Sequence, residues 1–202
     1  MPLSSPSDSP GSEAPAAAVE VMTEAALQEA ALDYLARYAA STTRLRRVLE
    51  RRVRRRSADR DVLEAARKTI ATVIAKLTAK GLLEDGHYAS TRAESLTRQG
   101  RSRRWIEAKL AADGVASPLI RGAIEALPGS RAQSELGAAI AFAKRRRIGP
   151  FRTPKRRSQE ELKALAGKEL AALARAGFDH RTARIVLDAG SAEALLAMLD
   201  EA

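Results

Sequence analysis

Few residues in this chain could carry out catalysis or bind a metal ion. The 202 residues include no Cys and only two His, His87 and His180, which lie far apart in the sequence. The absence of Cys excludes thiolate nucleophiles, Cys-based zinc sites and disulfides, and two distant imidazoles at expected surface positions offer little for a His-based centre. We therefore expect a protein that is not an enzyme and that uses no metal and no cofactor.

One acidic cluster could in principle hold a magnesium ion. It consists of Asp59, Asp61 and Glu64, and a metal-dependent nuclease built on it is the least favoured of three functional hypotheses. Acidic residues are favoured at the start of a helix by the helix dipole, which explains the cluster more simply. No glycine-rich loop of the kind that binds nucleotide phosphates occurs in the sequence.

The positive charge of the chain is concentrated in three segments. The net charge is +10, and segments 44–60, 98–109 and 144–157 contain 22 of the 35 Lys and Arg but only 3 of the 25 Asp and Glu. A sequence pI near 10.5 indicates a polyanionic partner. The regional clustering indicates where such a partner would bind.

The first basic segment is expected to form a helix with a basic face. At 100° per residue its candidate Arg residues share one arc, opposite Leu45, Leu49 and Val53. Such a face is either solvated without a function or in contact with phosphate or carboxylate groups, and the recurrence of the clusters favours contact. The candidate residues for partner and nucleic-acid binding are Arg44, Arg47, Arg51, Arg54, Arg55, Arg101, Arg103, Arg104, Lys144, Arg145, Arg146 and Arg147.

Aromatic side chains are scarce among these cations. Proteins that bind single-stranded nucleic acid usually stack bases on aromatic rings. Here Trp105 is adjacent to Arg104, but we expect this Trp to be a partly buried anchor of its helix. Contact with the nucleic-acid backbone is therefore favoured over the reading of bases.

The elements that position these residues are expected to be helical throughout. Ala occurs 42 times, and apolar residues recur at spacings of three and four, so we predict an all-α protein. We predict a disordered tail over 1–20 and three tandem three-helix repeats that form an elongated, curved body. The repeats cover 25–80, 85–127 and 131–188, the third contains a basic loop over 148–157, and an extra C-terminal helix covers 191–202.

Residues that start and end helices support these boundaries. Asp85 and Ser117 are expected to cap the helices that follow them, and Ser158 with Glu161 forms a capping-box pattern. Gly100 and Gly177 are expected to end helices, because glycine tolerates the left-handed conformation that follows a helix.

The location and assembly of the protein are also expected from the sequence. The amino terminus lacks the basic start and apolar block of a signal peptide, and no apolar stretch reaches the length of about 18 residues that a membrane-spanning helix needs. We expect a cytoplasmic monomer that does not bind membranes.

Four segments follow one another at a distinctive spacing. They are 31–37 with Ser41 and 45–49, then 73–85 with Tyr88 and Ala89, then Gly100 with Arg103, Ile106, Leu110, Gly114 and Val115, and finally 173–178. Over about residues 27–188 they resemble the RecX family of regulatory proteins, which act on the recombinase RecA. The chain departs from the family pattern at Arg44, where the family typically has Glu, and in the tail, the 144–157 segment and the helix after Gly190, which look like additions.

The resemblance implies a three-helix-repeat protein without enzymatic activity that lodges in the helical groove of the RecA filament on DNA. There it would restrain ATP hydrolysis and strand exchange in DNA repair and recombination, as part of the SOS response. The candidate cations would then face the filament and its DNA backbone.

The alternative is a basic helical protein that binds free DNA or RNA. In that hypothesis the helices expected over 102–113 and 117–127 serve as a helix-turn-helix. Tight binding to bare duplex would favour this alternative over a filament regulator.

Overall fold

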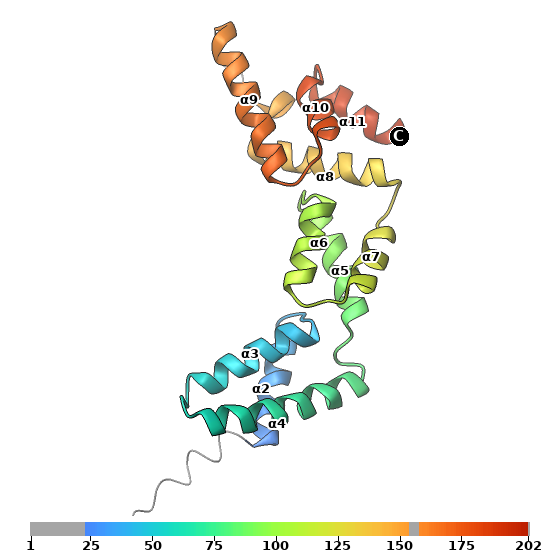
Figure 1. Cartoon of the computed structure of the whole chain (residues 1–202). Coiled ribbons are helices and arrows are strands. Elements are labelled where there is room, and N and C mark those ends of the chain that lie inside the picture. Colours follow the sequence, from blue (N-terminus) through green and yellow to red (C-terminus); the bar gives the residue numbers. More distant parts are fainter. Residues whose placement is uncertain (1–22, 154–157, 202) are drawn as a thin grey trace, which may run out of the picture. The chain divides into compact units, whose positions relative to one another are not determined.

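The computed structural model describes residues 23–153 and 158–201. Within them all regular structure is helical, with ten α-helices, one short 3-10 helix and no strand (Figure 1). This confirms the predicted all-α class. None of the described helices is both long and apolar enough to cross a bilayer. The predicted disordered tail over 1–20 and residues 154–157 of the predicted basic loop lie outside the described residues.

The described chain divides into two compact units. The first contains residues up to Tyr38 together with Leu45–Ala79. Its helices are α2 (Glu24–Leu35), most of α3 (Thr42–Arg54) and α4 (Arg60–Ala79).

Apolar residues on one side of each helix form the core of the first unit. The helical wheel correctly predicts that Leu45, Leu49 and Val53 of α3 are buried, opposite its cations. From α4, Ile70 and Val73 are fully buried as well. The basic side of α3 is therefore left facing solvent.

The second unit contains Ala39–Arg44 and the chain from Lys80 onward. Its first group of helices packs around one apolar cluster that includes Leu96, Ile106 and Leu110, and its second group around another that includes Phe142, Leu173 and Val186. The first group is α5 (Asp85–Arg98), α6 (Arg103–Ala112) and α7 (Ser117–Glu125). The second is α8 (Arg131–Arg146), the 3-10 helix η1 (Gly149–Phe151), α9 (Gln159–Arg175), α10 (His180–Asp188) and α11 (Ala192–Glu201).

Two glycines allow the two helix groups to approach closely. Gly100, at the end of α5, has φ of +71°, and a Cβ at this position would lie 2.6 Å from the backbone nitrogen of Phe142 in α8. Gly177, after α9, has φ of +89°, and a Cβ there would lie 2.5 Å from Ser102 Oγ. Because both positions combine a left-handed backbone with too little space for a side chain, they require glycine.

Helix starts agree with the sequence in some places and differ in others. The predicted capping box of Ser158 and Glu161 is present at the start of α9. Asp85 was expected to cap α5, but Glu84 does so, because the Asp85 carboxylate instead accepts hydrogen bonds from the backbone N–H of Thr42 at 2.8 Å and its hydroxyl at 2.9 Å. Similarly, Ser117 does not cap α7. It is the first residue of this helix, and Ala116 occupies the cap position.

The cap of α10 makes one contribution to stability that depends on pH. Asp179 accepts a hydrogen bond from the backbone N–H of Thr182 at 2.7 Å, and this bond lowers the pKa of Asp179 below its ordinary value of 3.8. A carboxyl whose pKa is lower in the folded than in the unfolded protein stabilises the fold at pH values above its pKa in the unfolded protein. This contribution is lost as the pH falls through its pKa in the folded protein.

We expect Asp179→Ala to lower the free energy of unfolding by about 1 kcal/mol at pH 7. In denaturant titrations the difference from the parent protein should shrink below about pH 4, since the parent loses its ionised cap there. Asp179→Asn is the control, because Asn also caps helices but does not titrate. A deficit for Asp179→Ala that stays constant down to pH 3 would contradict the assignment.

Candidate functional site

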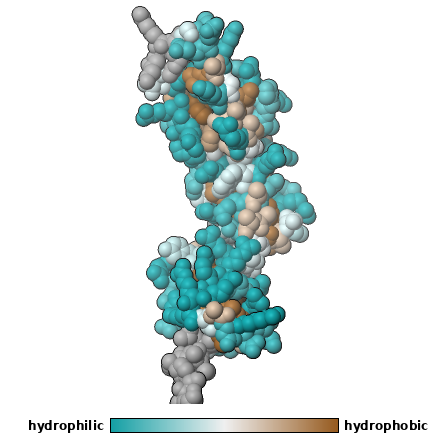
Figure 2. Space-filling model, turned by 60° about the vertical axis from the view of Figure 1, so that its left-hand side comes forward, coloured by the Kyte–Doolittle hydropathy of each residue, from teal (hydrophilic) through white to brown (hydrophobic). Residues whose placement is uncertain are grey.

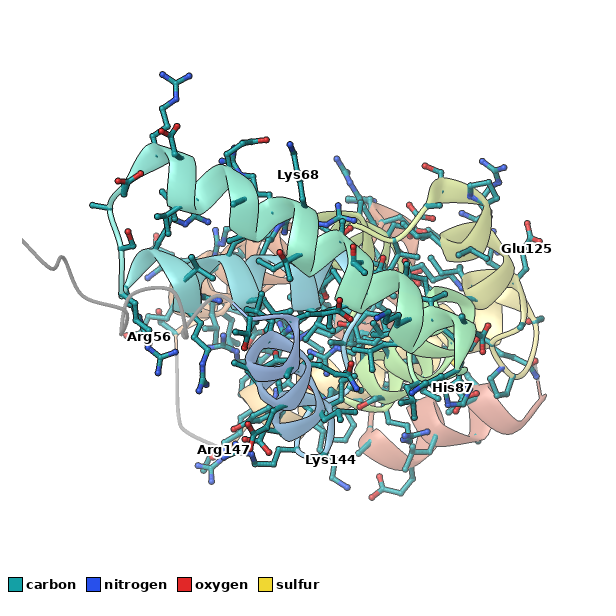
Figure 3. All side chains as sticks on the ribbon, turned by 90° about the horizontal axis from the view of Figure 1, so that it is seen from below. Arg56, Lys68, His87, Glu125, Lys144 and Arg147 are labelled. Carbon is teal, nitrogen blue, oxygen red and sulfur yellow. The ribbon has the colours of Figure 1, made fainter. Side chains whose placement is uncertain are left out.

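The basic face of α3 is exposed in the first unit. Arg47, Arg51 and Arg54 project from the helix, and Arg55 follows directly after its last residue. Arg54 is also paired with Glu50 on the next turn, at 3.3 Å. On the face of the first unit seen in Figure 2, hydrophilic residues predominate. Four further exposed cations of segment 44–60 were not among the candidate residues, namely Arg46, Arg52, Arg56 and Arg60, and Arg56 extends away from the ribbon in Figure 3.

Arg44 differs from the other candidates on α3. It is only half-exposed, it belongs to the second unit, and its Nη1 lies 3.6 Å from Oδ1 of the buried Asp113. Part of its charge is therefore neutralised by Asp113 within the protein. A helical wheel could not predict this pairing, because Asp113 lies on another segment.

Asp113 is the centre of a buried polar network. Its carboxylate accepts a hydrogen bond from the Tyr88 hydroxyl at 3.0 Å and pairs with Lys109 at 2.6 Å. The Ser41 hydroxyl donates to its backbone carbonyl. Burial raises the pKa of the Tyr88 hydroxyl, and the hydrogen bond to Asp113 raises it further. The network thus fixes the segment that leads into α3 to the end of α6.

The second group of candidate cations lies at the start of α6. Arg104 is exposed, whereas Arg103 is half-buried and donates from Nη1 to the Ile124 carbonyl at 3.1 Å. The guanidinium of Arg101 lies 4.5 Å from the centre of the Trp105 ring. The prediction that Trp105 is partly buried is confirmed. Because Arg101 occupies a face of this ring, that face is not open to a nucleobase.

The third group lies at the carboxyl end of α8. Lys144, Arg145, Arg146 and Arg147 are all exposed, and Figure 3 shows Lys144 and Arg147 extending outward. Arg145 donates a hydrogen bond to the Gln99 carbonyl. This contact brings the end of α8 next to the loop that carries Arg101. Cations are also favoured at the carboxyl end of a helix by the dipole, so part of this clustering stabilises α8 itself.

The remaining residues considered for catalysis or metal binding either have a structural role or are exposed. Asp59 accepts hydrogen bonds from the backbone N–H groups of Asp61 at 2.8 Å and Val62 at 3.2 Å, which confirms the interpretation of the acidic cluster as a helix start. Both His side chains are exposed. Among the described residues no group of His, Asp and Glu is arranged to hold a metal ion.

Comparison with known proteins gives a relative in sequence and a similar solved structure. Models of known protein families give no match. The regulatory protein RecX of Myxococcus xanthus (strain DK1622) is 40% identical over 172 residues, which cover 82% of this chain and 86% of that protein. The crystal structure of RecX from Lactobacillus salivarius superposes with a TM-score of 0.52 and 16% identity, covering 89% of this chain and 97% of that chain. At this low identity the second comparison supports the fold alone.

Proposed function

Since this chain belongs to the RecX family of regulatory proteins, we propose that it binds the RecA filament on DNA and inhibits the ATPase and strand-exchange activities of RecA. We also propose that three tandem repeats, over 25–80, 85–127 and 131–188, are the units that follow the filament. In this proposal the protein is cytoplasmic and has no enzymatic activity.

The observation that carries this proposal is a set of exposed cations on a RecX-family protein. The basic face of α3 and the run Lys144–Arg147 present guanidinium and ammonium groups to solvent. The planar guanidinium group of Arg can donate two parallel hydrogen bonds to a phosphate or a carboxylate. These surfaces therefore suit both the DNA backbone and acidic side chains of a protein filament. Arg44 and Arg103 contribute less, because internal partners hold them.

In the proposed mechanism the protein acts by occupying space and neutralising charge. Cations that bind phosphates or filament carboxylates release counterions and hold the helical body against the filament. A body held there obstructs the addition of RecA subunits or the movements that accompany ATP hydrolysis. No bond is made or broken by this chain.

Binding should depend strongly on salt. If six to ten phosphates are engaged, the affinity for RecA-coated single-stranded DNA should fall by about 300- to 10⁴-fold between 50 and 200 mM salt. Fluorescence anisotropy with labelled DNA, with and without RecA, measures this fall. An affinity that does not change with salt would contradict charge-driven binding.

Binding to free nucleic acid is the second candidate function. The helices α6 and α7 pack together, but the exposed side of α7 offers only Arg121 as a cation, beside Leu119 and the acidic Glu125. Such a face is poorly suited to the major groove, where recognition helices present several polar or basic side chains. Bare duplex bound as tightly as RecA-coated DNA would favour this second function.

A further inference from the structure

The second unit contains a groove between α6, α8, α10 and α11. It has a volume of about 1290 Å³. In Figure 1, α8 runs between α6 and the pair α10 and α11. All residues that line the groove belong to the second unit.

The floor of the groove is apolar. Leu136, Phe178 and Ile185 line it together with Met198 of α11. Met198 is 48% exposed, unlike the nearly buried Phe178. A long, flexible and exposed thioether among the apolar residues of a groove can adapt to the side chains of a bound peptide.

The rim of the groove carries cations from three helix starts. Arg104 comes from the first turn of α6, Arg131 from that of α8 and Arg181 from that of α10. All three are exposed, and within the described part of the chain no ion pair involves any of them. They are therefore available to acidic groups of a partner.

The acidic residues of the groove are already engaged. Glu135 accepts a hydrogen bond from the backbone N–H of Arg103 at 3.1 Å, and Asp188 pairs with Arg184 at 3.1 Å. Asp179 caps α10. The groove therefore offers a ligand positive charge at its rim beside an apolar floor.

From this arrangement we propose that the groove binds an acidic amphipathic helix of a partner protein. Apolar side chains on one face of that helix would fill the floor, and Glu or Asp residues flanking them would pair with Arg104, Arg131 and Arg181. The volume matches about three turns of helix, taken as a cylinder about 10 Å wide and 16 Å long. This inference goes beyond the proposed function, because it requires neither RecA nor DNA.

Selection from a peptide library tests the proposal directly. A phage-displayed library of random 16-residue peptides is selected on the full-length protein, with counter-selection on the triple variant Arg104→Glu, Arg131→Glu and Arg181→Glu. The expected consensus has apolar residues at helical spacing flanked by Glu or Asp. The triple variant should fold, because Glu in the first turn of a helix is favoured by the dipole.

The best peptide is then synthesised with a fluorescent label and its affinity measured. We expect the triple variant to bind about 30-fold more weakly and Met198→Gln about tenfold more weakly. The matched control reverses the same number of charges on exposed sites outside the groove, with Arg67→Glu, Arg121→Glu and Arg175→Glu, and should bind as the parent protein does.

Several results would overturn the proposal. These are selection of basic or uncharged peptides, equal binding by the triple variant and the matched control, and displacement of the peptide by single-stranded DNA. Binding seen only after residues 1–22 are removed would also overturn it, since the protein's own N-terminal segment would then be the occupant.

Discussion

Replacing Arg47, Arg51 and Arg54 together with alanine is expected to weaken binding to RecA-coated single-stranded DNA by about 10²-fold or more at 50 mM salt. On single-stranded DNA each cation that contacts a phosphate releases about 0.7 counterion, so removing three should also lower the slope of log affinity against log salt by about two. Anisotropy titrations at four salt concentrations between 50 and 200 mM give both quantities. Inhibition of RecA should weaken in parallel.

The control for this variant removes three exposed cations from other surfaces. Arg121, Lys168 and Arg175 are exposed and lie outside α3 and the run Lys144–Arg147, and their replacement changes the net charge by the same amount. Alanine is a strong helix former, so neither triple variant should lose stability. Equal weakening in both variants would show a general charge effect and contradict a specific role for α3.

Replacing Asp113 with alanine is expected to have the largest effect on stability. The change leaves Lys109, Arg44 and the buried Tyr88 hydroxyl without their shared acceptor. Breaking a buried ionic network costs about 3 kcal/mol or more, which for a chain of this length lowers Tm by about 6 to 12 °C. Calorimetry or thermal denaturation followed by circular dichroism measures the shift.

Two further variants identify the cause of that shift. Asp113→Asn keeps an acceptor for Tyr88 but removes the charge, so we expect an intermediate loss. Glu107→Ala removes an exposed carboxylate from α6, the helix that Asp113 follows, and should change Tm by less than about 2 °C. If Asp113→Ala and Glu107→Ala had the same Tm, the network around Asp113 would not be stabilising.

Periodicity and helix-capping residues were sufficient to predict the helices themselves. The apolar stripe of Leu45, Leu49 and Val53 is buried as predicted, and glycines such as Gly100 and Gly177 end helices as the sequence indicates. These features are local, because a helical face and a helix end depend on residues within a few positions of one another.

What the sequence could not predict depends on contacts between distant residues. Asp85 was expected to cap its own helix but binds Thr42, 43 positions away. Arg103 was a candidate for phosphate contact but its side chain reaches Ile124. The groove between α6 and α11 likewise combines residues more than ninety positions apart. Helical wheels contain no information on such pairings.

The most direct test of the account is DNA-dependent ATP hydrolysis by RecA, titrated with this protein at ratios well below one per RecA. We predict inhibition at these ratios, lost when Arg47, Arg51 and Arg54 are alanine and kept when Arg121, Lys168 and Arg175 are alanine. An ATPase rate that stays unchanged up to equimolar protein would contradict the account.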